Sequence, residues 1–204
     1  ILAVALGVVV GVVAAVNHGK WVDSVLMTIS VFGISAPAFW IAIILQIVIC
    51  LKFNLLPLSG IDSFKSFILP GIALGTRYAA SIARITRTSM LDVLSQDYIR
   101  TAEAKGLKGW VVTIKHALRN ALIPIITIAG SDLGNILTGS VLVESVFSIP
   151  GIGKMLVDSI NTRDLPIVQG GVMYIAVICV IMYLVVDLLY TVVDPRIRLG
   201  KESS

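Results

Sequence analysis

Residues that could catalyse a reaction or bind a metal are few in this sequence and lie far apart. The two histidines, His18 and His116, occur in separate segments without neighbouring ligands, and neither Cys50 nor Cys179 has a CxxC or Cys/His neighbourhood. Tight metal sites combine several such ligands at short spacings, so the sequence predicts no metal. Each cysteine is expected to have a buried structural role. With no Ser/His/Asp or Cys/His set recognisable either, an enzyme is the weakest of the broad classes.

None of the glycine-lysine pairs in the sequence forms a nucleotide-binding P-loop motif. The pairs that begin at Gly19, Gly153 and Gly200 are not followed by Ser or Thr, whereas a P-loop uses that hydroxyl to hold the magnesium of the nucleotide. The sequence therefore predicts no cofactor and no ATPase site of its own.

The polar side chains of most interest lie inside apolar runs. Asp132 and Asn135 interrupt one such run, and Arg77 interrupts another. An acid near the middle of a membrane span costs roughly 2.5 to 3.5 kcal/mol on insertion scales and must face a cavity or a partner. Two interpretations stay open: these residues line a translocation path, or Asp132 pairs with Arg77 and only holds the helices together.

The elements that position these residues are membrane spans. The chain of 204 residues is 57% hydrophobic and 14% charged, and residues 25–51 contain no charge at all. A helix of roughly 20 apolar residues crosses a bilayer. We therefore predict an all-α integral membrane protein, a single domain over residues 1–204 built as a bundle of about five spans. The expected spans are residues 1–16, 25–51 (kinked at Pro37), 67–86, 121–143 and 165–193.

The distribution of basic residues predicts the orientation of this bundle. When the connections are assigned alternately to the two sides, eleven Lys and Arg fall on one side and four on the other. The positive-inside rule then places residues 17–24, 87–120 and the C-terminal tail in the cytoplasm.

The connection 87–120 contains an amphipathic helix. Leu107, Val111, Ile114 and Leu118 recur at spacings of four, three and four, which places them on one helical stripe. Gly106 precedes the stripe and suits a turn between two helices. Periodicity alone leaves two interpretations open: the stripe docks into a groove of a partner, or it lies on lipid headgroups.

The residues of this connection resemble a motif of transport proteins. Arg100-Thr101-Ala102 is followed after three residues by Gly106, and after nine more by His116-Ala117-Leu118-Arg119-Asn120. This spacing resembles the EAA loop of permease subunits in binding-protein-dependent ABC importers, most closely the dipeptide, oligopeptide and nickel family. Family members read like DYIRTARAKGL followed by HALRNALIP. Further matching stretches are spread along the chain: residues 37–40, 56–60, 88–91, 144–147, 150–153, 163–166, 187–190 and 194–198.

The resemblance implies a type I ABC importer permease fold in which the first span of the family is missing from this sequence. It also implies four kinds of contact: ABC ATPase subunits, a second homologous permease, an extracytoplasmic substrate-binding protein and membrane lipid, with no nucleic acid. The coupling loop 87–120 would meet the ATPase through these residues: Tyr98, Arg100, Thr101, Ala102, Glu103, Ala104, Gly106, Leu107, Val111, Ile114, His116, Leu118, Arg119 and Asn120.

The expected activity is inward transport of di- or oligopeptides, or of a related small solute such as nickel, across the cytoplasmic membrane of a bacterium or archaeon. Two positions depart from the general EAA pattern, which has Glu at Arg100 and Pro at Arg119, although the peptide branch commonly departs in this way. The alternative is a secondary transporter or channel driven by an ion gradient, with Asp132 as its proton or cation site.

Overall fold

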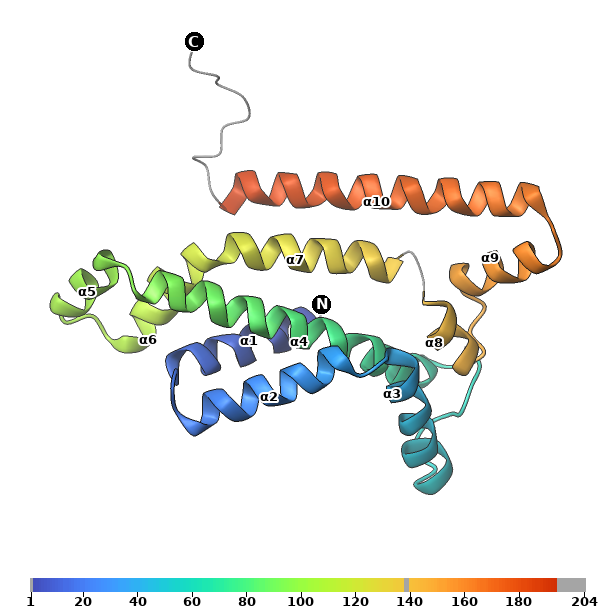
Figure 1. Ribbon diagram of the computed structural model, residues 1–204, viewed down its shortest axis with the longest axis horizontal. Helices are drawn as coiled ribbons and strands as arrows, with labels where there is room; N and C mark the ends of the chain where they lie inside the picture. The colour runs from blue at the N-terminus through green and yellow to red at the C-terminus, as the bar shows by residue number, and fades with distance from the viewer. Residues whose placement is uncertain (1, 138–139, 194–204) are drawn as a thin grey trace, which may run out of the picture.

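The computed structural model describes residues 2–137 and 140–193, and all of its regular elements there are helices. Figure 1 shows an elongated bundle with the short helices α5 and α6 at one end, here called the loop end. Helices α3, α8 and α9 lie at the opposite end, here called the far end. The prediction of an all-helical bundle is confirmed.

The first predicted span corresponds to helix α1 (Leu2–Val16), a shorter apolar helix that packs on the long helix α4 (Ile68–Leu94). Gly7 and Gly11 make this approach close. A Cβ at Gly7 would lie 2.7 Å from the carbonyl oxygen of Ala79, and one at Gly11 would lie 2.5 Å from Cβ of Thr86. Small residues at a spacing of four let two helix backbones meet in this way.

The second predicted span, 25–51, was expected to be one helix kinked at Pro37, but the structure has two separate helices there. Helix α2 (Trp21–Ser35) ends before Pro37, and α3 (Ala38–Leu45) continues in a π-helical segment (Gln46–Lys52) bent by 99° from α2. Ala36 and Pro37 both adopt extended backbone angles. Pro37 has no N–H to donate and disfavours the helical conformation of the residue before it, so the helix breaks here.

Helix α4 lies at the centre of the bundle. It packs against α1, α2 and α3, and also against α7 (Arg119–Leu137) and α8 (Val141–Val146). It ends at Leu94, eight residues later than predicted, so the connection that follows is shorter than residues 87–120. The helix of the third predicted span therefore extends further toward the loop end than the sequence predicts.

The fourth predicted span, 121–143, also has different bounds. Helix α6 (Gly109–Val111), a π-helical segment (Val112–Leu118) and α7 follow one another without a break, so one helical rod runs from Gly109 to Leu137. Helices α8 and α9 (Ile152–Asn161) follow at the far end. The amphipathic segment and the span are thus one helical element, whereas two were predicted from the sequence.

Helix α10 (Leu165–Val193) has the predicted bounds and lies along the edge of the bundle beside α7 (Figure 1). By length and composition, residues 109–136 and 165–188 are each able to cross a membrane, and the bent pair α2 and α3 would add a third crossing if it is one span. Most large side chains of α10 are exposed in this single chain. Such a surface suits lipid or a neighbouring subunit.

Candidate functional site

Helix α5 (Asp97–Ala104) begins the loop-end structure and is anchored by its apolar face. Ile99 and Ala102 are buried in one cluster with Ile82 and Met90 of α4, while Arg100 and Glu103 remain exposed. The same cluster includes Val112, Ala117, Ala121 and Ile125 of the rod 109–137. The loop end and the spans therefore share one continuous core.

Gly106 forms the turn between α5 and α6, as the sequence predicts. Its φ is +75°, and its N–H donates to the carbonyl oxygen of Glu103 at 2.8 Å. A Cβ at this position would meet no atom within 4 Å. The requirement for glycine here comes from the left-handed backbone and not from crowding.

The predicted apolar stripe is only partly formed. Leu107 is 41% exposed and Ile114 50%, but Val111 and Leu118 are half-buried. The π-helical turn at 112–118 has more residues per turn than an α-helix, so side chains spaced for an α-helix no longer align. Trp110, 68% exposed, completes the outward apolar surface with Leu107 and Ile114; we call these three residues the apolar knob.

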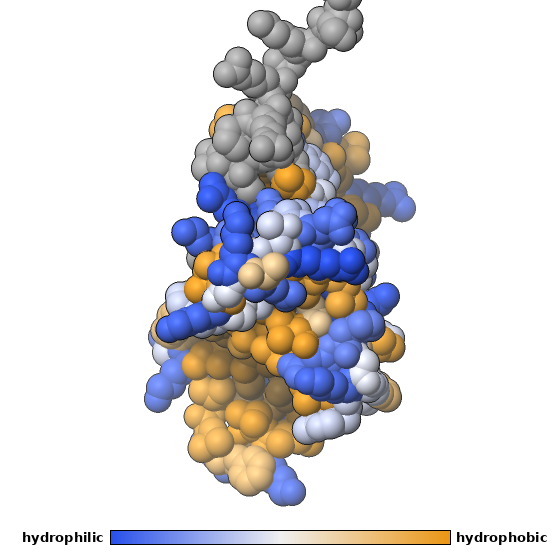
Figure 2. Space-filling model, turned by 90° about the vertical axis from the view of Figure 1, so that its left-hand side faces the viewer, coloured by the Kyte–Doolittle hydropathy of each residue, from blue (hydrophilic) through white to orange (hydrophobic). Residues whose placement is uncertain are grey.

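Basic side chains border the apolar knob. Lys108, Lys115 and Arg119 are exposed around it. Figure 2 looks at this end and shows hydrophilic side chains spread across its middle, with hydrophobic ones predominating in the lower part of the view. Exposed apolar side chains and exposed basic side chains therefore occur together at the loop end, a mixture that protein interfaces also show.

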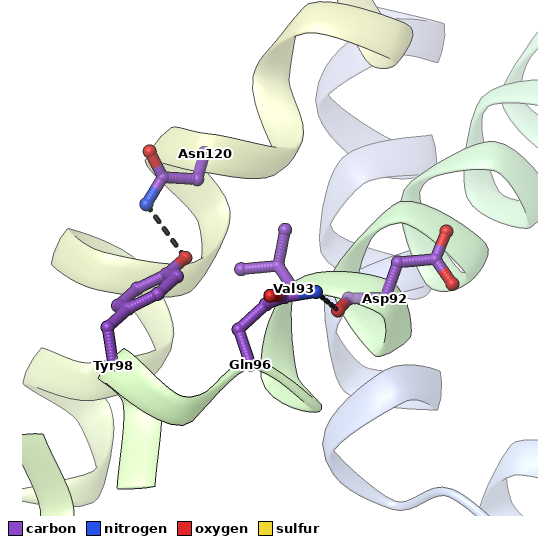
Figure 3. A pocket seen from close by; sticks show the side chains of 5 residues that line it. All are labelled: Asp92, Val93, Gln96, Tyr98 and Asn120. Carbon is purple, nitrogen blue, oxygen red and sulfur yellow. Dashed lines mark hydrogen bonds between the residues drawn. The ribbon is translucent and has the colours of Figure 1, made fainter. Parts of the chain in front are cut away.

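Tyr98 and Asn120 join α5 to the rod. The Asn120 side-chain amide donates to the Tyr98 hydroxyl at 2.8 Å and to the carbonyl oxygen of His116 at 2.8 Å. Figure 3 shows these side chains at one edge of an open pocket of about 480 Å³, which Asp92, Val93 and Gln96 also line. This pocket brings the end of α4, the start of α5 and the start of α7 together.

Polar residues continue from this pocket along α4 and α7. On α4, Arg77, Arg84, Thr88 and Asp92 are exposed, with Ser81 half-buried between them. On α7, Asn120, Pro124, Thr127 and Asn135 are exposed, with Ser131 half-buried. Both sets follow the spacing four, three, four and four, which keeps each on one side of its helix. The two helices are in contact, and we call these ten residues the polar face.

The intramembrane candidates are placed as follows. Arg77 and Asn135 belong to the polar face, whereas Asp132 is half-buried beside it and its Oδ2 is buried without a hydrogen-bond partner. Arg77 is close enough to act on Asp132 electrostatically. Among the described residues, however, no ion pair within 4.0 Å joins the two. The interpretation in which Asp132 and Arg77 form a tight structural ion pair is therefore not supported.

One cluster, which joins α2 to α4, was not predicted from the sequence. Asp23 is buried, and Arg87 binds both of its carboxylate oxygens while His18 Nδ1 lies 3.2 Å from Oδ2. The N–H of Gly19 also donates to Oδ2, at 3.2 Å. The sequence did contain a signal for this cluster: Asp23 stands at the start of an apolar run, and a charge buried there needs a partner.

Comparison with known proteins agrees with this architecture. Residues 7–199 match the family described as binding-protein-dependent transport system inner membrane component. The glutathione transport system permease protein GsiC of Escherichia coli (strain K12) is 45% identical over 196 residues, which is 96% of this chain and 64% of GsiC. GsiC of Salmonella typhi is 45% identical over 198 residues, 97% of this chain and 65% of that relative. The chain thus spans a little under two thirds of the length of these curated relatives. It belongs to the family of binding-protein-dependent transport system inner membrane components.

Proposed function

We propose that this chain is one of two permease subunits of an ATP-driven importer that carries a peptide-type solute into the cytoplasm. The observation that carries the proposal is the physical continuity between the apolar knob and the polar face. Trp110 and Ile114 of the knob and the α7 side of the polar face lie on one unbroken helical rod, Gly109–Leu137. Helix α5 is fixed to that rod by a shared core and by the Tyr98–Asn120 hydrogen bond.

The apolar knob is the proposed contact for the ATPase subunits. Trp110 and Ile114 are large exposed side chains, and the basic rim around them would give orientation at the contact. Aromatic anchors of this kind carry much of the binding energy in protein interfaces. An extracytoplasmic substrate-binding protein would deliver the solute at the far end.

The mechanism follows from the shared core. ATP-driven closure of the ATPase subunits would move the apolar knob, and the rod and α4 would move with it because Ile99, Val112 and Ala117 are packed against α4 side chains. Close-packed interiors transmit displacement rather than absorb it. The polar face would then be opened alternately to the two sides of the membrane, with the second permease forming the opposite wall.

A peptide-type solute is proposed from two lines of support. The relatives with 45% identity are named as permeases of glutathione transport systems. The polar face also carries cationic and amide groups that suit carboxylates and peptide bonds. We place the importer in the cytoplasmic membrane of a bacterium or archaeon, where lipid would cover the apolar surface of α10.

The test is to charge the apolar knob. Trp110→Asp should lower the affinity for the ATPase by roughly 30-fold, since truncating an interface anchor costs about 2 kcal/mol or more. Lys108→Ala, on the polar rim, is the matched control and should change it little. Copurification of the ATPase and solute-stimulated ATP hydrolysis in the reconstituted importer are the two measurements. Full retention of both by Trp110→Asp would contradict the proposal, as would uptake driven by an ion gradient without ATP.

A further inference from the structure

Two arginines on the polar face form no ion pair within the described part of the chain. Arg77 and Arg84 are both exposed and lie seven residues apart on α4, about two turns or 10.5 Å along the axis. Over residues 2–137 and 140–193, no carboxylate lies within 4.0 Å of either guanidinium. Arg87, on the same helix, differs because it is held by Asp23.

The depth of Arg77 makes its exposure informative. It lies nine residues after the start of α4 and seventeen before its end, or about 14 Å and 25 Å along the axis. An arginine close to a helix end can reach the headgroups with its long side chain, but one near mid-span requires a polar cavity or a partner. In the assembled importer, the polar residues beside it on α4 and α7 would form one wall of such a cavity.

The charge of the polar face is unbalanced over most of its length. Its α7 side carries amide and hydroxyl groups and Pro124 but no charged residue. The nearby acid, Asp132, is half-buried, and Asp92 lies at the loop end of the face, two turns beyond Arg84. With two guanidinium groups and one half-buried acid, the stretch from Arg77 to Arg84 carries a net positive charge.

We propose that Arg77 and Arg84 are specificity-determining residues that favour solutes with a net negative charge, each binding a carboxylate in turn. The proposal rests on the polar face being the translocation path. A guanidinium presents a planar fork of donors that matches a carboxylate. A cleft lined by one sign of charge raises the local concentration of the opposite ion by 10-fold or more. Two sites about 10.5 Å apart allow a carboxylate to be passed from one to the next.

The main test compares two probe peptides in the complete importer, reconstituted with its ATPases, second permease and binding protein. Ala-Ala-Glu and Ala-Ala-Gln have nearly the same size and differ by one charge. The double variant Arg77→Gln with Arg84→Gln should lower the ratio of the Ala-Ala-Glu uptake rate to the Ala-Ala-Gln uptake rate by roughly 10-fold relative to the unmodified importer. Because the binding protein is the same in both importers, this change isolates the permease. The double Lys variant keeps the charge and should keep the ratio, and Lys65→Gln, a cation outside the polar face, is the control.

A second measurement does not depend on which solute is carried. In a chain lacking Cys50 and Cys179, Thr88→Cys places a thiol one turn from Arg84 on the polar face. In the assembled importer, an anionic thiosulfonate should react with this thiol faster than a cationic one, and the double Gln variant should lower that rate ratio by roughly 10-fold. Ser63→Cys, at the far end, should show no such change.

Three outcomes would overturn the proposal: an unchanged uptake ratio, an unchanged thiol rate ratio, or loss of the second permease from the Gln variant. The last would show that the arginines bind a carboxylate of the neighbouring subunit instead. Failure of the ATPase to copurify with the unmodified chain would contradict the proposed function, and it is measured separately from both ratios.

Discussion

Arg87 holds Asp23 through two hydrogen bonds, from Nε to Oδ1 at 2.6 Å and from Nη2 to Oδ2 at 2.7 Å. The pair joins the start of α2 to α4 at the residue directly after the last one expected in the third span. The Asp23 side chain is 6% exposed and that of Arg87 22%. The ion pair thus fixes the α1–α2 hairpin to the helix that leads into the loop end.

Asp23→Asn should destabilise the chain by roughly 2 kcal/mol. Breaking a fully buried ion pair costs about 3 to 5 kcal/mol, and the partial exposure of Arg87 reduces that cost. Thermal unfolding in detergent measures the effect. The exchange Asp23→Arg with Arg87→Asp should recover part of the lost stability. Asp97→Asn, which changes a fully exposed acid, is the control and should hardly change the unfolding temperature. Equal unfolding temperatures for Asp23→Asn and Asp97→Asn would show that the pair contributes nothing.

Gly106→Val should uncouple ATP hydrolysis from transport while leaving the spans folded. The backbone φ of +75° costs a non-glycine residue about 1 to 2 kcal/mol, so the turn between α5 and α6 should change its direction. Gly109→Val is the matched control, because a side chain also meets open space there and its φ is not positive. Solute-stimulated ATP hydrolysis is the measurement. The glycine requirement is refuted if both variants are stimulated equally.

Gly11→Ala should weaken the packing of α1 on α4. The added Cβ would lie 2.6 Å from the carbonyl oxygen of Ala83, a backbone atom that cannot rotate away, and overpacking of this kind costs about 1 to 3 kcal/mol. Gly71→Ala, which meets no atom within 4 Å, is the control. Thermal unfolding should separate the two variants, and a Gly11→Ala protein as stable as Gly71→Ala would contradict this account of the contact.

Asp132→Asn should preserve transport better than Asp132→Leu. Asn keeps a polar group of the same shape beside the polar face, whereas Leu leaves any polar partner in the path unpaired at a cost of about 1 to 3 kcal/mol. Uptake rates in the reconstituted importer, normalised to the amount of inserted protein, give the comparison. Equal rates for the two variants would remove Asp132 from the path.

The orientation predicted from the basic residues can be tested by labelling. Ser63 lies in the connection between α3 and α4, at the far end, and Lys108 directly precedes α6, at the loop end (Figure 1). Cysteines at these positions, in a chain without Cys50 and Cys179, should react with an impermeant reagent from opposite sides of the membrane. Labelling of both from the same side would refute the proposed topology.

The sequence predicted the helical class, the bounds of α10 and the turn at Gly106 because each depends on local chemistry. It did not predict the 99° bend, although it located the break, because proline removes a hydrogen bond without setting the new direction. It placed Leu118 on an outward stripe, but the π-helical turn and the shared core made that residue half-buried. Asp23 and Arg87 are 64 residues apart, and only the tertiary structure brings them together.

Because the rod from Gly109 to Leu137 is unbroken, it also fixes how the apolar knob and the α7 side of the polar face are rotated relative to each other about the helix axis. Each residue turns an α-helix by about 100°. One residue inserted between Ile114 and Ser131 would therefore rotate Asn135 away from the polar face while Trp110 kept its orientation at the loop end. A one-residue insertion in the connection 53–63, outside any such rod, would be absorbed by the chain. In this protein the tolerance to changes of length is thus set by whether a segment must keep two distant surfaces in register.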